Sequence, residues 1–179
     1  MTNDSALLLG CEASQLAGLP GRHRVALCAE VLDRVTRRVR TSVSLAACTL
    51  TDATVTAAWA VVGDEIGCGD ELDMAVRRWR SVASHTDLPP VLEGIHQIIE
   101  ALDGCASATN SVTIDLTGVT DPALRTLANA VDDLFAVGAI DDIDVADIHR
   151  IARELVRGNE LGLDLDPLLL SIALGSQST

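Results

Sequence analysis

Apolar residues recur at intervals of three and four along most of the chain, which is the spacing of one face of an α-helix. The clearest case lies between residues 89 and 107. Its apolar side carries Val91, Leu92, Ile95, Ile98, Ile99, Leu102 and Cys105, and its polar side carries Glu93, His96, Gln97, Glu100 and Asp103. This two-sided pattern predicts a helix that packs on a core along one face and meets solvent along the other.

An earlier stripe follows Pro20, a residue well suited to the first position of a helix. The stripe consists of Val25, Cys28, Leu32, Val35 and Val39. We expect this helix to run on into residues 41–48. The next helix is predicted to begin at Thr51 or Asp52, because both residue types are good N-caps.

Glycine-rich residues 63–69 predict a turn, and Asp70 is the predicted cap of a third helix. This third helix should end before the paired prolines at positions 89 and 90, because proline cannot continue a helix. Residues 111–119 alternate weakly, as in a strand, but no second strand is available to pair with them. We therefore interpret them as a loop.

The C-terminal part predicts three more helices. Asp121 or Thr120 caps the first, with Pro122 at its first position, and a long helix follows over about residues 145–159. A short helix should follow Asp166 and Pro167. The apolar face of the first is expected to contain Leu124, Leu127, Val131, Leu134 and Phe135. The whole chain, residues 1–179, is thus predicted to form one compact all-α domain of about seven helices.

Composition limits which residue types can form the core and indicates the cellular compartment. Hydrophobic residues make up 48 % of the chain but aromatic residues only 2 %, so the core must be aliphatic. The five cysteines are scattered and form no CxxC motif, so we interpret them as small buried hydrophobic residues in a reducing compartment, with Cys68 the best candidate for an exposed thiol. No apolar run reaches the length of a membrane span, and the first residues lack a basic segment. These features predict a cytoplasmic protein that does not bind membranes.

The formal net charge of -13 argues against a nucleic-acid partner, because acidic surfaces oppose phosphate binding. Six of the thirteen basic residues nevertheless lie between Arg22 and Arg40. Glu30 and Asp33 lie four residues before Arg34 and Arg37, which favours helical ion pairs. The arginines at positions 22, 24, 38 and 40 have no such local partner.

Two readings of this arginine cluster stay open. Acidic residues in the segment 131–147 could pair with it within the chain or across a homodimer, and we favour this reading. Alternatively, the cluster could bind an anionic ligand or an acidic peptide. The candidate binding residues are Arg34, Arg37, Arg38, Arg40 and Trp79. Trp79 has arginines on both sides, and it could grip a partner or be anchored in the core.

The sequence offers little catalytic chemistry. Glu93 and His96 form an ExxH unit of the kind used twice in di-iron bundles, but Ala146 occupies the place of the second glutamate before His149. We therefore expect no metal and no cofactor. The catalytic candidates that remain are Glu93, His96 and Glu100.

Four stretches resemble the YjaG-like helical family, a bacterial domain of unknown function (family 416). They are LPGRHRVALCAEVLDR, DLPPVLEGIHQIIEAL, DPAL with the later Phe135, and IARELVRGNELGLDL, within about residues 12–165. The resemblance implies an all-α globular fold and supplies no established reaction. The sequence thus predicts a cytoplasmic binding or accessory protein that acts through protein or peptide contacts. The alternative is a small metal-independent enzyme that modifies a peptide or natural product in a charged groove.

Overall fold

The computed structural model describes residues 7–63, 68–85, 87–109 and 121–175. Within them the chain forms eight helices and one short antiparallel pair of strands, which confirms the all-α prediction. The elements are β1 (Leu7–Leu8), β2 (Cys11–Glu12), α1 (Ala13–Ala17), α2 (Gly21–Val39), α3 (Leu45–Val62), α4 (Cys68–Ala83), α5 (Pro90–Thr109), α6 (Pro122–Ala136), α7 (Asp142–Glu160) and α8 (Leu165–Gly175). The predicted loop at 111–119 and most of the predicted turn at 63–69 lie outside the described residues.

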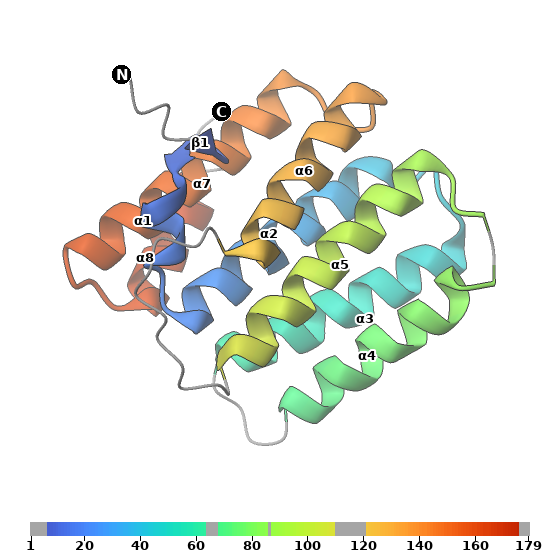
Figure 1. Ribbon diagram of the computed structural model, residues 1–179, viewed down its shortest axis with the longest axis horizontal. Helices are drawn as coiled ribbons and strands as arrows, with labels where there is room; N and C mark the ends of the chain where they lie inside the picture. Colours follow the sequence, from blue (N-terminus) through green and yellow to red (C-terminus); the bar gives the residue numbers. More distant parts are fainter. Residues whose placement is uncertain (1–6, 64–67, 86, 110–120, 176–179) are drawn as a thin grey trace.

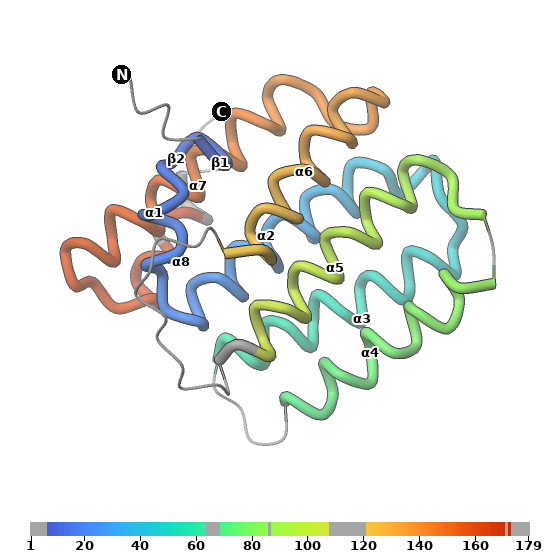
Figure 2. Tube along the Cα trace, in the orientation of Figure 1, coloured from blue at the N-terminus to red at the C-terminus, as the bar shows by residue number. Residues whose placement is uncertain are grey.

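Helix α2 holds the bundle together. It packs against α3, α5 and α7, while α5 also packs against α4 and α6 (Figure 1). The trace in Figure 2 shows α3, α4 and α5 side by side, with α1, α7 and α8 gathered on the opposite side of α2. The predicted stripe of α2 is buried along its whole length, from Val25 to Val39. Its apolar spacing therefore accounts for its central position.

The boundary between α2 and α3 differs from the prediction. Helix α2 ends at Val39 and does not run into residues 41–48, and α3 begins at Leu45 rather than at Thr51 or Asp52. Ser44 is the N-cap, because its backbone is extended and its hydroxyl accepts a hydrogen bond from the Ala47 N–H at 3.2 Å. The Thr51 hydroxyl instead donates to a carbonyl one turn earlier, inside the helix.

The later helices agree with the sequence in position and differ in detail. Asp121 caps α6 as predicted, accepting from the Ala123 N–H. Helix α7 begins three residues earlier than predicted, because Asp141 and Asp144 form a capping box. The prediction that Phe135 belongs to the apolar face of α6 is wrong, since this side chain is 45 % exposed and next to the fully buried Leu134.

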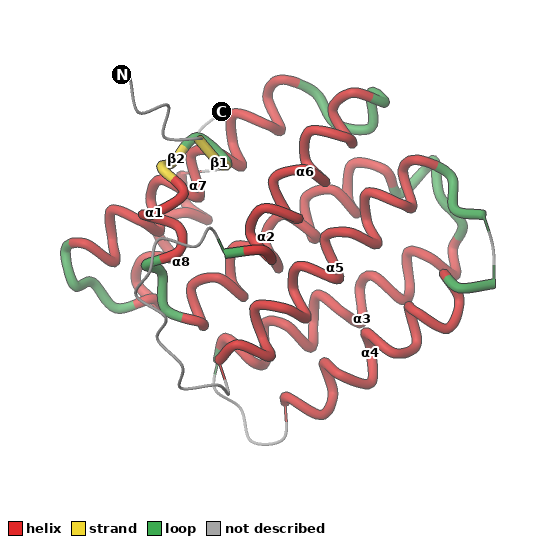
Figure 3. Tube along the Cα trace, in the orientation of Figure 1, coloured by secondary structure: helices red, strands yellow, loops and turns green. Residues whose placement is uncertain are grey.

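A small N-terminal unit, coloured as strand and helix in Figure 3, was not predicted. Strands β1 and β2 are joined through Leu9 and Gly10, which both have positive φ. A side chain at Gly10 would lie 3.1 Å from His149, so glycine suits both the turn and the close contact with α7. Leu16 of the short helix α1 is completely buried. The unit therefore belongs to the core of the domain.

The cysteines behave as small hydrophobic residues wherever their side chains are described. Cys11, Cys28, Cys48 and Cys105 are free thiols and are buried, and the side chain of Cys68 lies outside the description. The sulfur atoms of Cys28 and Cys105 are 3.8 Å apart between α2 and α5. This hydrogen bond and complete burial raise the pKa of the Cys28 thiol well above its usual value.

Helix α3 is the one described helix that is long and apolar enough to span a membrane by length and composition alone. The sequence prediction overlooked it because threonines and Asp52 interrupt its apolar residues. In the fold α3 packs against both α2 and α4. A core helix of a soluble bundle has the same composition, so this single helix is weak support for a membrane protein.

Candidate functional site

The arginines in the C-terminal half of α2 pair with carboxylates of the same chain. Their partners are Asp147 for Arg34, Asp33 for Arg37, Asp141 and Asp144 for Arg38, and Asp52 for Arg40. Asp141, Asp144 and Asp147 come from the acidic segment that the sequence singled out. Pairing within the chain is thus confirmed for these four candidate binding residues. Whether they also bind a partner stays a prediction.

Trp79 is anchored in the core and is only 2 % exposed. Of the two readings, the structure has the core-anchored one, and whether Trp79 contacts a partner stays a prediction. Its indole N–H donates to Nδ1 of His96 at 3.1 Å. A neutral His96 in this arrangement carries its proton on Nε2.

The neighbouring Arg80 donates to both carboxylate oxygens of Glu100 at 2.7 Å, and to Asp103 at 2.7 Å. These charge-assisted bonds lower the pKa of Glu100 and hold it as a carboxylate. Two of the three catalytic candidates, His96 and Glu100, thus already form hydrogen bonds with side chains of α4. The third, Glu93, is exposed and lies on α5, the helix that also carries His96 and Glu100.

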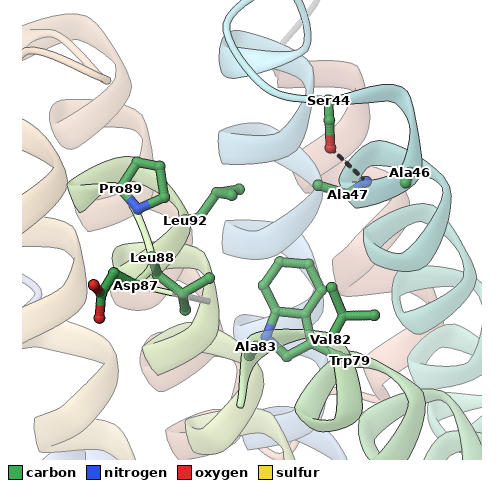
Figure 4. A pocket seen from close by; sticks show the side chains of 10 residues that line it. All are labelled: Ser44, Ala46, Ala47, Trp79, Val82, Ala83, Asp87, Leu88, Pro89 and Leu92. Carbon is green, nitrogen blue, oxygen red and sulfur yellow. Dashed lines mark hydrogen bonds between the residues drawn. The ribbon is translucent and has the colours of Figure 1, made fainter. Parts of the chain in front are cut away.

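Directly beside Trp79 lies an apolar pocket of about 350 Å³. Its wall is built from the start of α3, the end of α4, residues 87–89 and the first turn of α5. Figure 4 shows Trp79, Val82, Leu88 and Leu92 around it, while the carboxylate of Asp87 turns away from them. Ser44 contributes its hydroxyl, which is already engaged in capping α3. The pocket therefore offers apolar contact and few hydrogen bonds.

The rim of this pocket is apolar as well. Val82 belongs to its wall and is 53 % exposed. Exposed large apolar side chains next to a hollow are typical of sites that bind other molecules. We use the name apolar pocket for this hollow and the residues that line it.

None of Glu93, His96 and Glu100 lines the apolar pocket. Sequence reasoning identified Trp79 but missed the pocket, because its wall combines two stretches that are distant in the sequence, residues 44–47 and 79–92. The one local signal was Leu88, an apolar residue isolated between Asp87 and two prolines, outside any helical stripe.

No protein-family model, curated protein or solved structure matches this chain. The resemblance to the YjaG-like helical family therefore stays a prediction. Within the described residues no three or more histidine, cysteine or acidic side chains gather in a group that could hold a metal ion. The expectation that the protein needs neither metal nor cofactor is likewise still a prediction.

Proposed function

We propose that the protein is a cytoplasmic binding or accessory protein whose apolar pocket takes apolar side chains from a peptide segment of a partner. The observation that carries this proposal is the wall of the pocket: Trp79, Val82, Leu88 and Leu92 surround the hollow, and the described wall residues place no free polar group between them. Catalysis would instead need polar groups that converge on a substrate.

The size and charge of the surroundings suggest what the segment looks like. A volume of about 350 Å³ is near the lower end for small-molecule sites and suits one or two apolar side chains. Asp87 and Glu93 are exposed near the pocket, and the chain as a whole is strongly acidic. A basic amphipathic helix, with apolar residues on one face and arginine or lysine on the other, is the complementary partner.

The enzyme alternative has less support from the geometry. A general acid or base must come within hydrogen-bond reach of its substrate. His96 accepts from buried Trp79, and Glu100 is held by Arg80. A homodimer remains compatible with the proposal, with a second copy supplying the apolar segment, and sedimentation of the purified protein measures this directly.

The experiment uses a fluorescent synthetic helix of leucine and arginine as the probe, with binding followed by anisotropy. Ala46→Trp fills the pocket from its exposed rim, whereas Ala53→Trp adds the same side chain to an exposed position of α3 outside the pocket wall. We expect Ala46→Trp to weaken binding by about tenfold or more, because well-packed pockets dominate binding energy, and Ala53→Trp to change it by less than about twofold. Equal effects of both variants, or no saturable binding to the wild type, would contradict the proposal.

A further inference from the structure

A second pocket, of about 520 Å³, lies where α2 begins. One wall is the first turn of α2 with Pro20, Arg22, His23 and Arg24, and the other is the connection from α7 to α8 at residues 163–165. These two segments lie far apart in the sequence and meet at the edge of the bundle (Figure 2). None of its wall residues belongs to the apolar pocket.

The start of α2 is electrostatically unusual. The N-terminal end of a helix carries a partial positive charge and is normally stabilised by acidic residues or a polar cap. Helix α2 has Pro20 as its N-cap, no side-chain cap bond and no acidic residue in its first turn. It places Arg22 and Arg24 there instead, with His23 between them, in a chain of net charge -13. Positive charge is therefore concentrated where the helix disfavours it.

The backbone adds hydrogen-bond donors at the same place. The first N–H bond within this end of the helix runs from Arg24 to the carbonyl of Pro20. The N–H groups of Gly21, Arg22 and His23 consequently have no acceptor inside the helix. Such a row of N–H groups, aligned with the helix dipole, suits an anion.

His23 provides the independent observation. It lines the pocket but is only 9 % exposed, and neither of its ring nitrogens has a hydrogen-bond partner. The Nε of Arg24 is also buried without a partner. Buried donors left unsatisfied cost free energy, so native proteins rarely keep them unless something else supplies the acceptor.

The positive charge beside the pocket is not fully neutralised by carboxylates of the described part of the chain. Arg22 bonds the carbonyl oxygen of Val62, at 2.8 Å from its Nε, so its positive charge is held in place without being neutralised there by a carboxylate. Arg24 shares its charge with Asp121. Asp164, on the opposite wall, is exposed to solvent, and Leu163 beside it presents an exposed apolar surface.

We propose that this pocket is a binding site for an oxyanion, a phosphate or carboxylate group of a small molecule, held by the first turn of α2 with Arg22 and His23. The oxyanion accepts hydrogen bonds from the free backbone N–H groups, the Arg22 guanidinium and the His23 ring. Leu163 contacts the apolar part of the same molecule. The site is independent of the apolar pocket, and the peptide-binding proposal can fail without affecting it.

Nuclear magnetic resonance of isotope-labelled wild-type protein tests the site directly. The probes are inorganic phosphate, phenyl phosphate and benzoate, each compared with sodium chloride at the same ionic strength. We expect saturable shifts of the Gly21, Arg22 and His23 amides and of the His23 ring with at least one oxyanion, and none with chloride. Preference for phenyl phosphate over benzoate assigns the natural ligand to phosphate esters, and the reverse assigns it to carboxylates.

Two variants distinguish specific binding in this pocket from general electrostatic attraction to the protein. Arg22→Gln removes a charge at the pocket, and Arg77→Gln removes one from an exposed position on α4, where Arg77 pairs with Asp73. Loss of one charge-assisted contact should weaken binding by about tenfold or more in Arg22→Gln, with Arg77→Gln unchanged. His23→Gln provides a second test at the ring, and the amide spectrum of each variant verifies its fold. Equal weakening in both arginine variants, or the absence of saturable shifts with all three oxyanions, would overturn the proposal.

Discussion

The two ends of α2 carry the same residue type in opposite circumstances. At the C-terminal end, Arg34, Arg37, Arg38 and Arg40 each meet a carboxylate of the same chain, and positive charge there also agrees with the helix dipole. At the N-terminal end, Arg22 bonds a backbone carbonyl, His23 has no partner, and the dipole opposes the charge. Arg22 and Arg38 are about 24 Å apart at 1.5 Å per residue.

The arginine-rich stretch is therefore two structures rather than one surface. At the C-terminal end Arg34, Arg38 and Arg40 join α2 to the acidic residues of α7 and α3, and Arg37 pairs within α2, so these arginines need no ligand to balance their charge. At the N-terminal end, the Arg22 charge has no carboxylate partner, and the His23 ring has no hydrogen-bond partner among the described residues. A run of like charges in a sequence does not reveal this difference, because it depends on which carboxylates the fold brings near.

The largest change in the free energy of unfolding should come from a substitution in the apolar stripe, which runs along the whole of α2. Leu32 is fully buried near the middle of α2. Leu32→Ala should lower the free energy of unfolding by about 2–5 kcal/mol, through lost burial and the cavity left behind. Urea denaturation measures the change, and Leu32→Met, which nearly conserves volume, should cost less than about 1.5 kcal/mol. Similar small losses for both variants would show that this stripe does not anchor the helix.

A smaller loss is expected at the N-terminal end from Asp121, which pairs with Arg24 and also caps α6. Asp121→Ala removes both interactions and should cost about 2–4 kcal/mol, because the Arg24 side chain is mostly buried. Asp121→Asn keeps an oxygen for the cap and should lose about half as much. If thermal or urea unfolding shows equal losses for the two variants, the cap contributes nothing beyond the ion pair.

The pH dependence of stability should also distinguish the two ends. Burial and the neighbouring Arg22 charge lower the pKa of His23 from its ordinary value of 6.5. As the pH falls through that ordinary value, the unfolded chain takes up the proton before the folded protein does, so the free energy of unfolding decreases. This contribution belongs to the N-terminal end, because residues 31–40 at the other end contain no histidine.

Unfolding experiments at a series of pH values, comparing the wild type with His23→Gln, measure this contribution. The variant should lose less stability than the wild type as the pH falls from neutral to below the ordinary histidine value of 6.5. His85→Gln is the matched control, because His85 is exposed. A wild-type slope that persists unchanged in His23→Gln would show that His23 is not responsible for it.

The smallest change in the free energy of unfolding is expected from substitutions at the C-terminal end of α2. The side chain of Arg40 is half exposed, as is that of its partner Asp52, and exposed pairs contribute little. Arg40→Ala should change the free energy of unfolding by about 0.5 kcal/mol or less. In the double variant with Arg38→Ala, sizing should show the oligomeric state of the wild type. A change in that state would instead assign this end of α2 to a contact between copies of the chain.

Features that depend on local spacing were predicted well. The faces of α5, the stripe of α2 and the Asp121 cap follow from residues within a few turns of one another. The α3 start was missed because Ser44, Thr51 and Asp52 are all good caps by type, and only the backbone conformation chooses among them. The two-residue strands near the N-terminus are too short to produce an alternating pattern.

The candidate sites depended on contacts that the sequence does not contain. Trp79 was recognised as a residue of interest, but its neighbours Leu88 and Ala47 come from other segments of the chain. Burial of His23 could have been predicted from the sequence, because it lies four residues before Leu27 on the inner side of α2. That spacing predicts burial of the ring, and it does not reveal that the ring nitrogens have no partner.

The bond between Trp79 and His96 also gives the protein an optical reporter. The chain has two tryptophans and no tyrosine, so its ultraviolet emission comes almost entirely from Trp59 and Trp79. The Trp79 indole forms part of the apolar pocket and donates its only N–H to a neighbouring ring. In a Trp59→Phe background the emission spectrum would come from that single indole. Any molecule that enters the pocket could then be followed by fluorescence without attaching a dye.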